Sequence, residues 1–112
     1  MSFDLTSAIE QKMVELEQSI RFLRTHGDKL ALAEKEYKMC LTQKALELRE
    51  SGMAVTLIDT VIYGLKEVAL KRYERDLAKT MYEANLEHIN ATKLQLRLLE
   101  AQISREWSHP SA

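Results

Sequence analysis

The chain has 112 residues, of which 46% are hydrophobic, 29% charged and 6% aromatic, and its formal net charge is −1. This length allows one domain, over residues 1–112, and an elongated helical chain of this size cannot enclose a deep interior. A net charge near zero excludes a strong overall attraction to nucleic acid or anionic membranes, so such contacts would have to be local. Three glycines and one proline are few turn residues, and this composition predicts an all-α fold.

The single cysteine and the first residues bear on the cellular setting. Cys40 stands alone, which excludes an intramolecular disulfide and a multi-cysteine metal site and suits a reducing cytosol. The first segment, MSFDLTSAIEQK, carries an acid where a signal peptide needs bases. No apolar run approaches the roughly 18 residues of a membrane span. We therefore expect a cytoplasmic protein without a membrane partner.

The first long helix is predicted for residues 5 to about 50, with Asp4 or Ser7 as its N-terminal cap. One seam follows alternating steps of four and three, the spacing of a helix that packs along a partner helix. The seam consists of Ile9, Met13, Leu16, Ile20, Leu23, Gly27, Leu30, Glu34, Tyr37, Leu41, Lys44 and Leu48. Ala33 and Ala45 can replace Glu34 and Lys44 if the contact line drifts. Gly27 should weaken the helix by about 1 kcal/mol relative to Ala without ending it, because the seam stays in phase.

A connector is predicted for residues 51–64. Gly52 can end the first helix in a left-handed conformation, and the segment from Thr56 to Asp59 has the form of a capping signal for a short helix that closes at Gly64. Most of the connector is apolar. It either closes the core of a helical hairpin as a cap or forms a knob that binds a partner.

The second long helix is predicted for residues 65–107, followed by a tail at 108–112 in which Pro110 stops the helix. Its first half carries the seam Leu65, Ala69, Tyr73, Leu77, Met81 and Ala84. Its second half carries two apolar lines, one of Tyr82, Leu86, Ile89, Leu96, Ile103 and Trp107, the other of Ala91, Leu94, Leu98 and Ala101.

Two apolar lines on one helix indicate more than one neighbour. The two long helices have similar lengths and should pair as an antiparallel, coiled-coil-like hairpin. We expect the surplus line to be covered by a second copy, in a two-fold homodimer that joins the ends far from the connector into a helical bundle. The candidate oligomer or partner residues are Leu86, Ile89, Leu96, Leu98, Ile103, Trp107, Val61 and Ile62.

No constellation of catalytic residues is found. The sequence has no phosphate-binding glycine loop, no nucleophile elbow and no H-E-x-x-H motif, and His26, His88 and His109 are far apart. We predict a protein that is not an enzyme and has no metal or cofactor.

One segment has an alternative interpretation as a nucleic-acid reader. A short helix, a turn at Gly64 and a basic helix follow in the order of a helix-turn-helix. The residues that would face DNA are Lys66, Lys71, Arg72, Arg75 and Lys79. Acidic residues at Glu67, Glu74 and Asp76 can pair with these cations within the helix, so a salt-bridged, solvated face is favoured over DNA binding.

Two stretches carry a resemblance: LRESGMAVTLI, and VALKRYERDLAKTMYEANLEHINATKLQLRLLEAQISREW with its ISREW ending. They resemble small proteins encoded in the early gene blocks of phages and prophages of Gram-positive bacteria, over about residues 30–107. That group has no established activity and supplies no functional residues. The resemblance implies the cytoplasm of a host cell as the setting. It implies no mechanism. The surplus apolar line of the second long helix and the apolar connector lead us to expect a phage-type interaction factor with a host or phage protein as partner. Such a factor would be either an inhibitor of a host nuclease or defence factor or a replication or recombination accessory.

Overall fold

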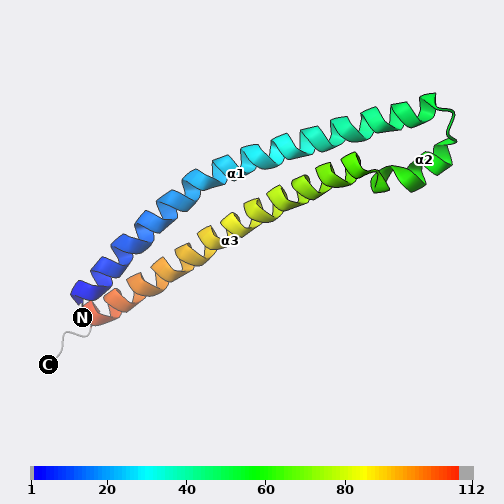
Figure 1. Cartoon of the computed structure of the whole chain (residues 1–112). Coiled ribbons are helices and arrows are strands. Elements are labelled where there is room, and N and C mark those ends of the chain that lie inside the picture. Colours follow the sequence, from blue (N-terminus) through cyan, green and yellow to red (C-terminus); the bar gives the residue numbers. More distant parts are fainter. Residues whose placement is uncertain (1, 109–112) are drawn as a thin grey trace. The chain divides into compact units, whose positions relative to one another are not determined.

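The computed structural model describes residues 2–108, with side chains from residue 4 onward. The chain forms α1 (Ser2–Glu50), α2 (Val55–Val61), the 3-10 turn η1 (Ile62–Gly64) and α3 (Lys66–Ser108), in that order (Figure 1). Residues 2–108 contain no strand. The predicted all-α fold of two long helices joined by a short helix is confirmed. Of the predicted tail at 108–112, Ser108 belongs to α3, and residues 109–112, with Pro110, lie outside the described residues.

The chain divides into two compact units, unit 1 with residues 1–25 and 83–112 and unit 2 with residues 26–82. In unit 1 the first part of α1 and the last part of α3 lie side by side, and Asn85 Nδ2 donates a hydrogen bond of 2.9 Å to the carbonyl oxygen of Ser19. In unit 2, Lys71 Nζ of α3 lies 3.4 Å from Glu36 Oε2 of α1. Gly27 of α1 faces the ring of Tyr82 of α3. The helices therefore run antiparallel, as predicted. The single domain over residues 1–112 stays a prediction.

The start of α1 differs from the prediction. The helix already includes Ser2, so Asp4 and Ser7 lie inside it and neither is its cap. Asp4 still favours the helix electrostatically, because a negative charge in the first turn complements the helix dipole. The predicted continuity through Gly27 is confirmed, since α1 is unbroken to Glu50.

The end of α1 is a glycine-terminated turn. Gly52 has a φ of 89°, which an L-residue rarely adopts. The N–H of Met53 donates to the carbonyl of Leu48 at 3.2 Å, and that of Gly52 donates to Arg49 at 3.0 Å. These two bonds form a Schellman motif, which satisfies carbonyls that the helix end would otherwise leave free.

The connector closes the core of unit 2. Ile58 and Ile62 are buried together with Tyr37 of α1 and Val68 of α3. The N-cap of α2 is Ala54 and not Thr56, so the predicted capping signal is wrong. The Thr56 carbonyl instead accepts a hydrogen bond from the hydroxyl of Thr60. The prediction that part of this apolar segment packs under the long helices is confirmed.

The contact face of α1 is only partly the predicted seam. The line from Leu16 through Leu23 and Leu30 to Tyr37 is at least half-buried, but Met13 and Ile20 are exposed. The residues just before these two, Lys12 and Ser19, turn inward instead, and His26, Ala33 and Cys40 continue their line at steps of seven. Most of these side chains are small, so the facing helix can approach closely. As anticipated, Ala33 replaces Glu34, which is exposed.

The contact face of α3 follows one unbroken seven-residue repeat. It consists of Val68, Arg75, Tyr82, Ile89, Leu96 and Ile103, with Lys71, Ala78, Asn85, Thr92 and Leu99 beside them. The predicted first-half seam is wrong after Leu65, because Ala69, Tyr73, Leu77, Met81 and Ala84 are exposed. The predicted residues lie on another side of α3 than Ile89 and Leu96, so the helix would have to pack with different sides in its two halves. A helix that packs on a single partner buries one face.

Candidate interaction surfaces

Among the cations proposed to face DNA, Lys71, Arg72 and Arg75 have contacts within unit 2. Lys71 Nζ lies 3.4 Å from a carboxylate oxygen of both Glu74 and Glu36. Hydrogen bonds to Glu74 and then to Glu36 raise the pKa of Lys71 above its usual value. This lysine is therefore paired within unit 2, although water screens such half-exposed pairs.

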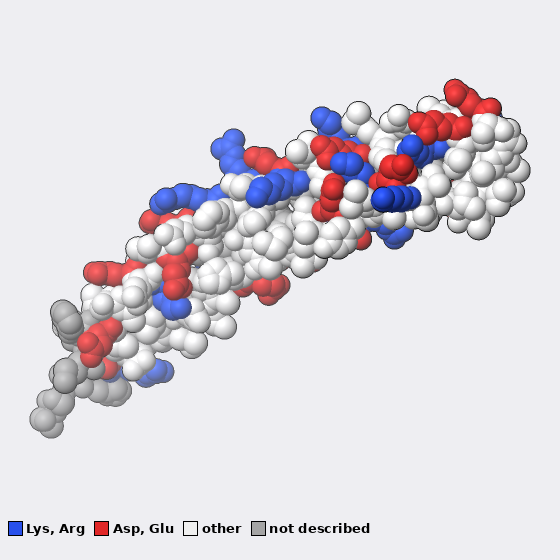
Figure 2. Space-filling model, in the orientation of Figure 1, with Lys and Arg blue, Asp and Glu red and all other residues white. Residues whose placement is uncertain are grey.

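Two arginines of the same helix lie over aromatic rings. The Arg75 guanidinium is 4.7 Å from the ring centroid of Tyr37 and 2.8 Å from Asp76, and that of Arg72 is 5.6 Å from the ring centroid of Tyr63. Cation–π contacts hold such groups against the protein. Acidic and basic side chains also alternate over the visible face of unit 2 (Figure 2). Phosphate binding would therefore have to displace existing partners.

The other two members of that basic set lie at the surface. Lys66 is the first residue of α3 and is exposed, and Lys79 is exposed one turn beyond Arg75. The residue before α3 is Leu65, so this helix start has no polar cap. The order of a short helix, a turn and a basic helix is confirmed, but α3 then continues to Ser108.

The histidines take no part in a metal cluster within residues 4–108. No group of three His, Cys, Asp or Glu side chains in that range could hold a metal ion. The hydroxyl of Thr92 donates to the carbonyl of His88 at 2.8 Å, a bond within α3. Within the described helices, none is long and apolar enough to cross a membrane.

The predicted partner residues fall into two classes. Ile62, Ile89 and Leu96 are buried against their own chain, and Leu86, Ile103 and Val61 are half-buried. Leu98 and Trp107 are exposed, by 61% and 75%. Only the last two leave most of their surface for another chain, and the role of all eight in partner binding stays a prediction.

The surplus apolar line predicted on the second half of α3 is exposed in unit 1. We call it, with its continuation in both directions, the outer line of α3. It consists of Ala84, Glu87, Ala91, Leu94, Leu98, Ala101, Arg105 and Ser108, all exposed. Leu94 and Leu98 are each two residues from Leu96, and two residues turn an α-helix by about 200°. The outer line therefore faces away from the side that packs on α1.

A second exposed apolar surface lies on α3 within unit 2. Leu70, Tyr73, Leu77 and Met81 are each about half-exposed or more. Leu77 and Met81 line a hollow of about 240 Å³ that also includes Ala78, with His26 and Lys29 of α1 and Glu74 at its edge. The lining of this hollow thus combines apolar side chains with the charged groups of Lys29 and Glu74, the mixture of apolar and polar groups that protein interfaces contain.

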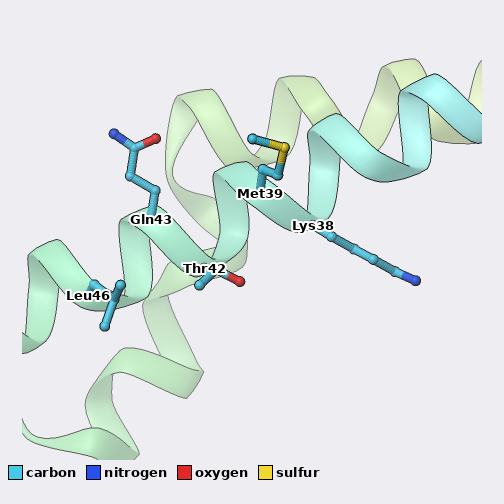
Figure 3. A pocket seen from close by; sticks show the side chains of 5 residues that line it. All are labelled: Lys38, Met39, Thr42, Gln43 and Leu46. Carbon is cyan, nitrogen blue, oxygen red and sulfur yellow. The ribbon is translucent and has the colours of Figure 1, made fainter.

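A third exposed surface, which the sequence interpretation missed, lies on α1 of unit 2. Leu32, Met39 and Leu46 are separated by seven residues each and are exposed. Figure 3 shows the hollow around Met39, with Met39 and Gln43 pointing to one side of the helix and Thr42 and Leu46 to the other. All five lining residues belong to α1, so the hollow is open. The seven-residue spacing of Leu32, Met39 and Leu46 is the sequence signal that could have identified this surface.

The connector contributes the last apolar surface. Val55, Leu57 and Tyr63 are exposed, and the end of unit 2 that holds α2 is largely free of charged side chains in Figure 2. One face of the connector thus closes the core, as the cap alternative predicted, while the other faces solvent. That the exposed face binds a partner as a knob stays a prediction.

Comparisons of the chain with known protein families, with curated proteins and with solved structures gave no match. Interpretation of these surfaces therefore depends on the residues themselves. Their common property is exposed apolar area on rigid helices, which can bind another protein chain.

Proposed function

We propose that this chain is a non-enzymatic interaction factor that acts by presenting apolar helix faces to other protein chains, including a second copy of itself. The observation that carries the proposal is the outer line of α3. Leu94 and Leu98 stay 54% and 61% exposed on a helix whose opposite side already packs on α1. Contiguous apolar surface of this kind marks interaction sites in soluble proteins.

The proposed setting follows from the resemblance of residues 30–107 to early-region phage proteins. In that setting the partner is a host or phage protein in the host cytoplasm. The factor then inhibits a host nuclease or defence factor, or assists replication or recombination. A short chain of rigid helices acts most simply by occupying a surface of its target.

DNA binding through the basic part of α3 is the alternative function, and less supports it. Lys71, Arg72 and Arg75 have partners within unit 2. Titration with duplex and single-stranded DNA at two salt concentrations separates the two functions. Steep salt dependence that vanishes when these three charges are reversed would favour DNA binding, because phosphate contacts release counterions.

The proposal is tested by binding experiments on the full chain. Sedimentation equilibrium over a range of concentrations measures self-association. In parallel, the immobilised chain is exposed to host lysate beside three variants, each with one lysine in one apolar surface: Leu98→Lys, Met39→Lys and Leu77→Lys. We expect one defined protein to be retained stoichiometrically and lost with one of the three variants only. A chain that stays monomeric and retains no protein at stoichiometric level would overturn the proposal.

A further inference from the structure

The outer line of α3 has nearly the same order of side-chain sizes from its N-terminal end as from its C-terminal end, so two antiparallel copies of it are complementary. Its residues follow strict alternating steps of three and four, from Ala84 to Ser108. The centre of the line lies at the level of Leu96 along the helix, on the side opposite the Leu96 side chain. Outward from this centre come Leu94 and Leu98, then Ala91 and Ala101, and then the charged pair Glu87 and Arg105. The order of sizes is thus a palindrome, and the charges at its two ends are opposite.

We propose that the occupant of this line is the α3 helix of a second copy, packed antiparallel about a two-fold axis beside Leu96. This inference rests on the proposed function and names one partner and one face for it. In this arrangement Leu94 meets Leu98 of the second copy, and Leu98 meets its Leu94. Ala91 and Ala101 face each other twice, and their small side chains allow the two helices to approach closely.

Charge complementarity decides the direction of the pairing. In the antiparallel arrangement Glu87 faces Arg105 of the second copy, and the two-fold axis repeats this pair. The described part of the chain shows no other ion pair for either residue. A parallel, in-register pair would instead place Glu87 against Glu87 and Arg105 against Arg105, and like charges at such positions disfavour a pairing.

The residues that flank the outer line lie along the two edges of the proposed interface. Rotation about the two-fold axis brings each edge onto the same edge of the second copy, so Gln95 lies near Gln95 of the second copy and Asn90 lies near its Ser104. These side chains can donate and accept hydrogen bonds. The exposed Arg97 lies near Arg97 of the second copy, a single like-charge contact that water screens and that the two Glu87–Arg105 pairs outnumber. The proposed interface therefore has apolar residues at its centre and polar residues at its edges, as protein interfaces do.

A charge-swap series measured by sedimentation equilibrium tests the inference. Glu87→Arg or Arg105→Glu alone creates two like-charge contacts and should weaken the dimer about threefold to tenfold at low salt. The double variant Glu87→Arg with Arg105→Glu restores opposite charges and should return the dissociation constant to near that of the natural chain. If either single variant leaves the dimer unchanged, or the double variant fails to recover it, the antiparallel pairing is overturned.

Leucine variants locate the interface. Leu94→Lys should weaken the dimer about a hundredfold, because each symmetric dimer loses the side chain twice. Met39→Lys is the matched control, an equally exposed apolar residue on α1 of unit 2, and should leave association unchanged. A dimer that survives Leu94→Lys would overturn the inference and leave the proposed function standing. A chain that is monomeric but retains another protein would also overturn the inference and leave the proposed function standing.

Cross-linking tests the register directly, in a Cys40→Ser background. A mixture of the Ala91→Cys and Ala101→Cys chains should form a disulfide-linked heterodimer, because these positions face each other across the axis. Either variant alone should not, because two copies of the same position are separated by roughly ten residues, or about 15 Å along the helices. Efficient linkage of Ala91→Cys with itself would indicate a parallel pair and overturn the inference.

Discussion

The two adjacent residues Ile58 and Leu57 provide a sharp test of how the connector stabilises unit 2. Ile58 is 6% exposed and packs with Tyr37, Ile62 and Val68, whereas Leu57 is 49% exposed. Ile58→Ala removes three buried carbons, which at about 0.8 kcal/mol each gives about 2.5 kcal/mol, and a residual cavity raises this to about 3 kcal/mol. Leu57→Ala removes groups that are half in water and should cost about 1 kcal/mol.

The measurement is urea unfolding followed by far-ultraviolet circular dichroism, at one fixed chain concentration because association shifts apparent stability. Both variants place Ala in the same helix, so differences in helix propensity contribute only a few tenths of a kcal/mol. We expect a lower midpoint for Ile58→Ala with an unchanged dependence on urea. Equal losses for the two variants would refute the assignment of the connector as the closing cap of this core.

Three further changes test the helices. Gly27→Ala should raise the free energy of unfolding by up to about 1 kcal/mol, because the added Cβ would lie 3.5 Å from the nearest tyrosine ring carbon, an ordinary contact; a lower melting temperature would contradict this. Asn85→Ala removes the hydrogen bond to Ser19 and should cost about 1 kcal/mol in urea unfolding, against less than about 0.5 kcal/mol for the exposed Asn90→Ala. The carboxylates bonded to Lys71 raise its pKa above 10.5, so the stability that they confer is complete below that pH and lost as pH rises through the folded-state pKa. The stability difference between the natural chain and Lys71→Met should therefore shrink at alkaline pH, and a constant difference would contradict the pairing.

The helices themselves could be predicted from the sequence because their signals are local. The predicted ranges 5–50 and 65–107 differ by one to three residues from the observed Ser2–Glu50 and Lys66–Ser108. Gly52 marked the end of α1 correctly, since its positive φ is a conformation that glycine adopts without strain. The predicted caps at Asp4, Ser7 and Thr56 failed because several short polar residues lie near each helix start and sequence patterns fix boundaries poorly.

The register of the contact faces could not be read from hydrophobicity alone. On α1 the sequence favoured Met13 and Ile20, but the structure buries Ser19 and half-buries Lys12, each one residue earlier. Adjacent positions differ by about 100° around a helix, so both lie near the same seam. Which of them faces inward depends on the size and shape of the partner helix, which the pattern of one helix does not contain.

Polar residues on the contact face of α3 caused the larger error. This face includes Lys71, Arg75, Asn85 and Thr92. A search for apolar residues at helical spacing does not find such polar positions. The lysine and arginine stems pack against α1 while their charged ends reach partners at the edge, and Asn85 satisfies its amide on the backbone of α1. Extending the repeat of Tyr82, Ile89, Leu96 and Ile103 backward by sevens would have reached Arg75 and Val68.

The two faces of α3 differ in residue size, and that difference decides which of them α1 covers. The inner face in unit 1 presents Ile89, Leu96 and Ile103, whereas the outer line has only Leu94 and Leu98 as large side chains. Packing the outer line on α1 would expose these three large apolar side chains to bury two, a loss of about 1.5–3 kcal/mol. The hairpin therefore forms on the bulky face without help from a second copy. Lysine substitutions at Leu94 and Leu98 should accordingly abolish association while the helical signal and cooperative unfolding persist, and a chain that unfolds with either change would show that folding and association are coupled.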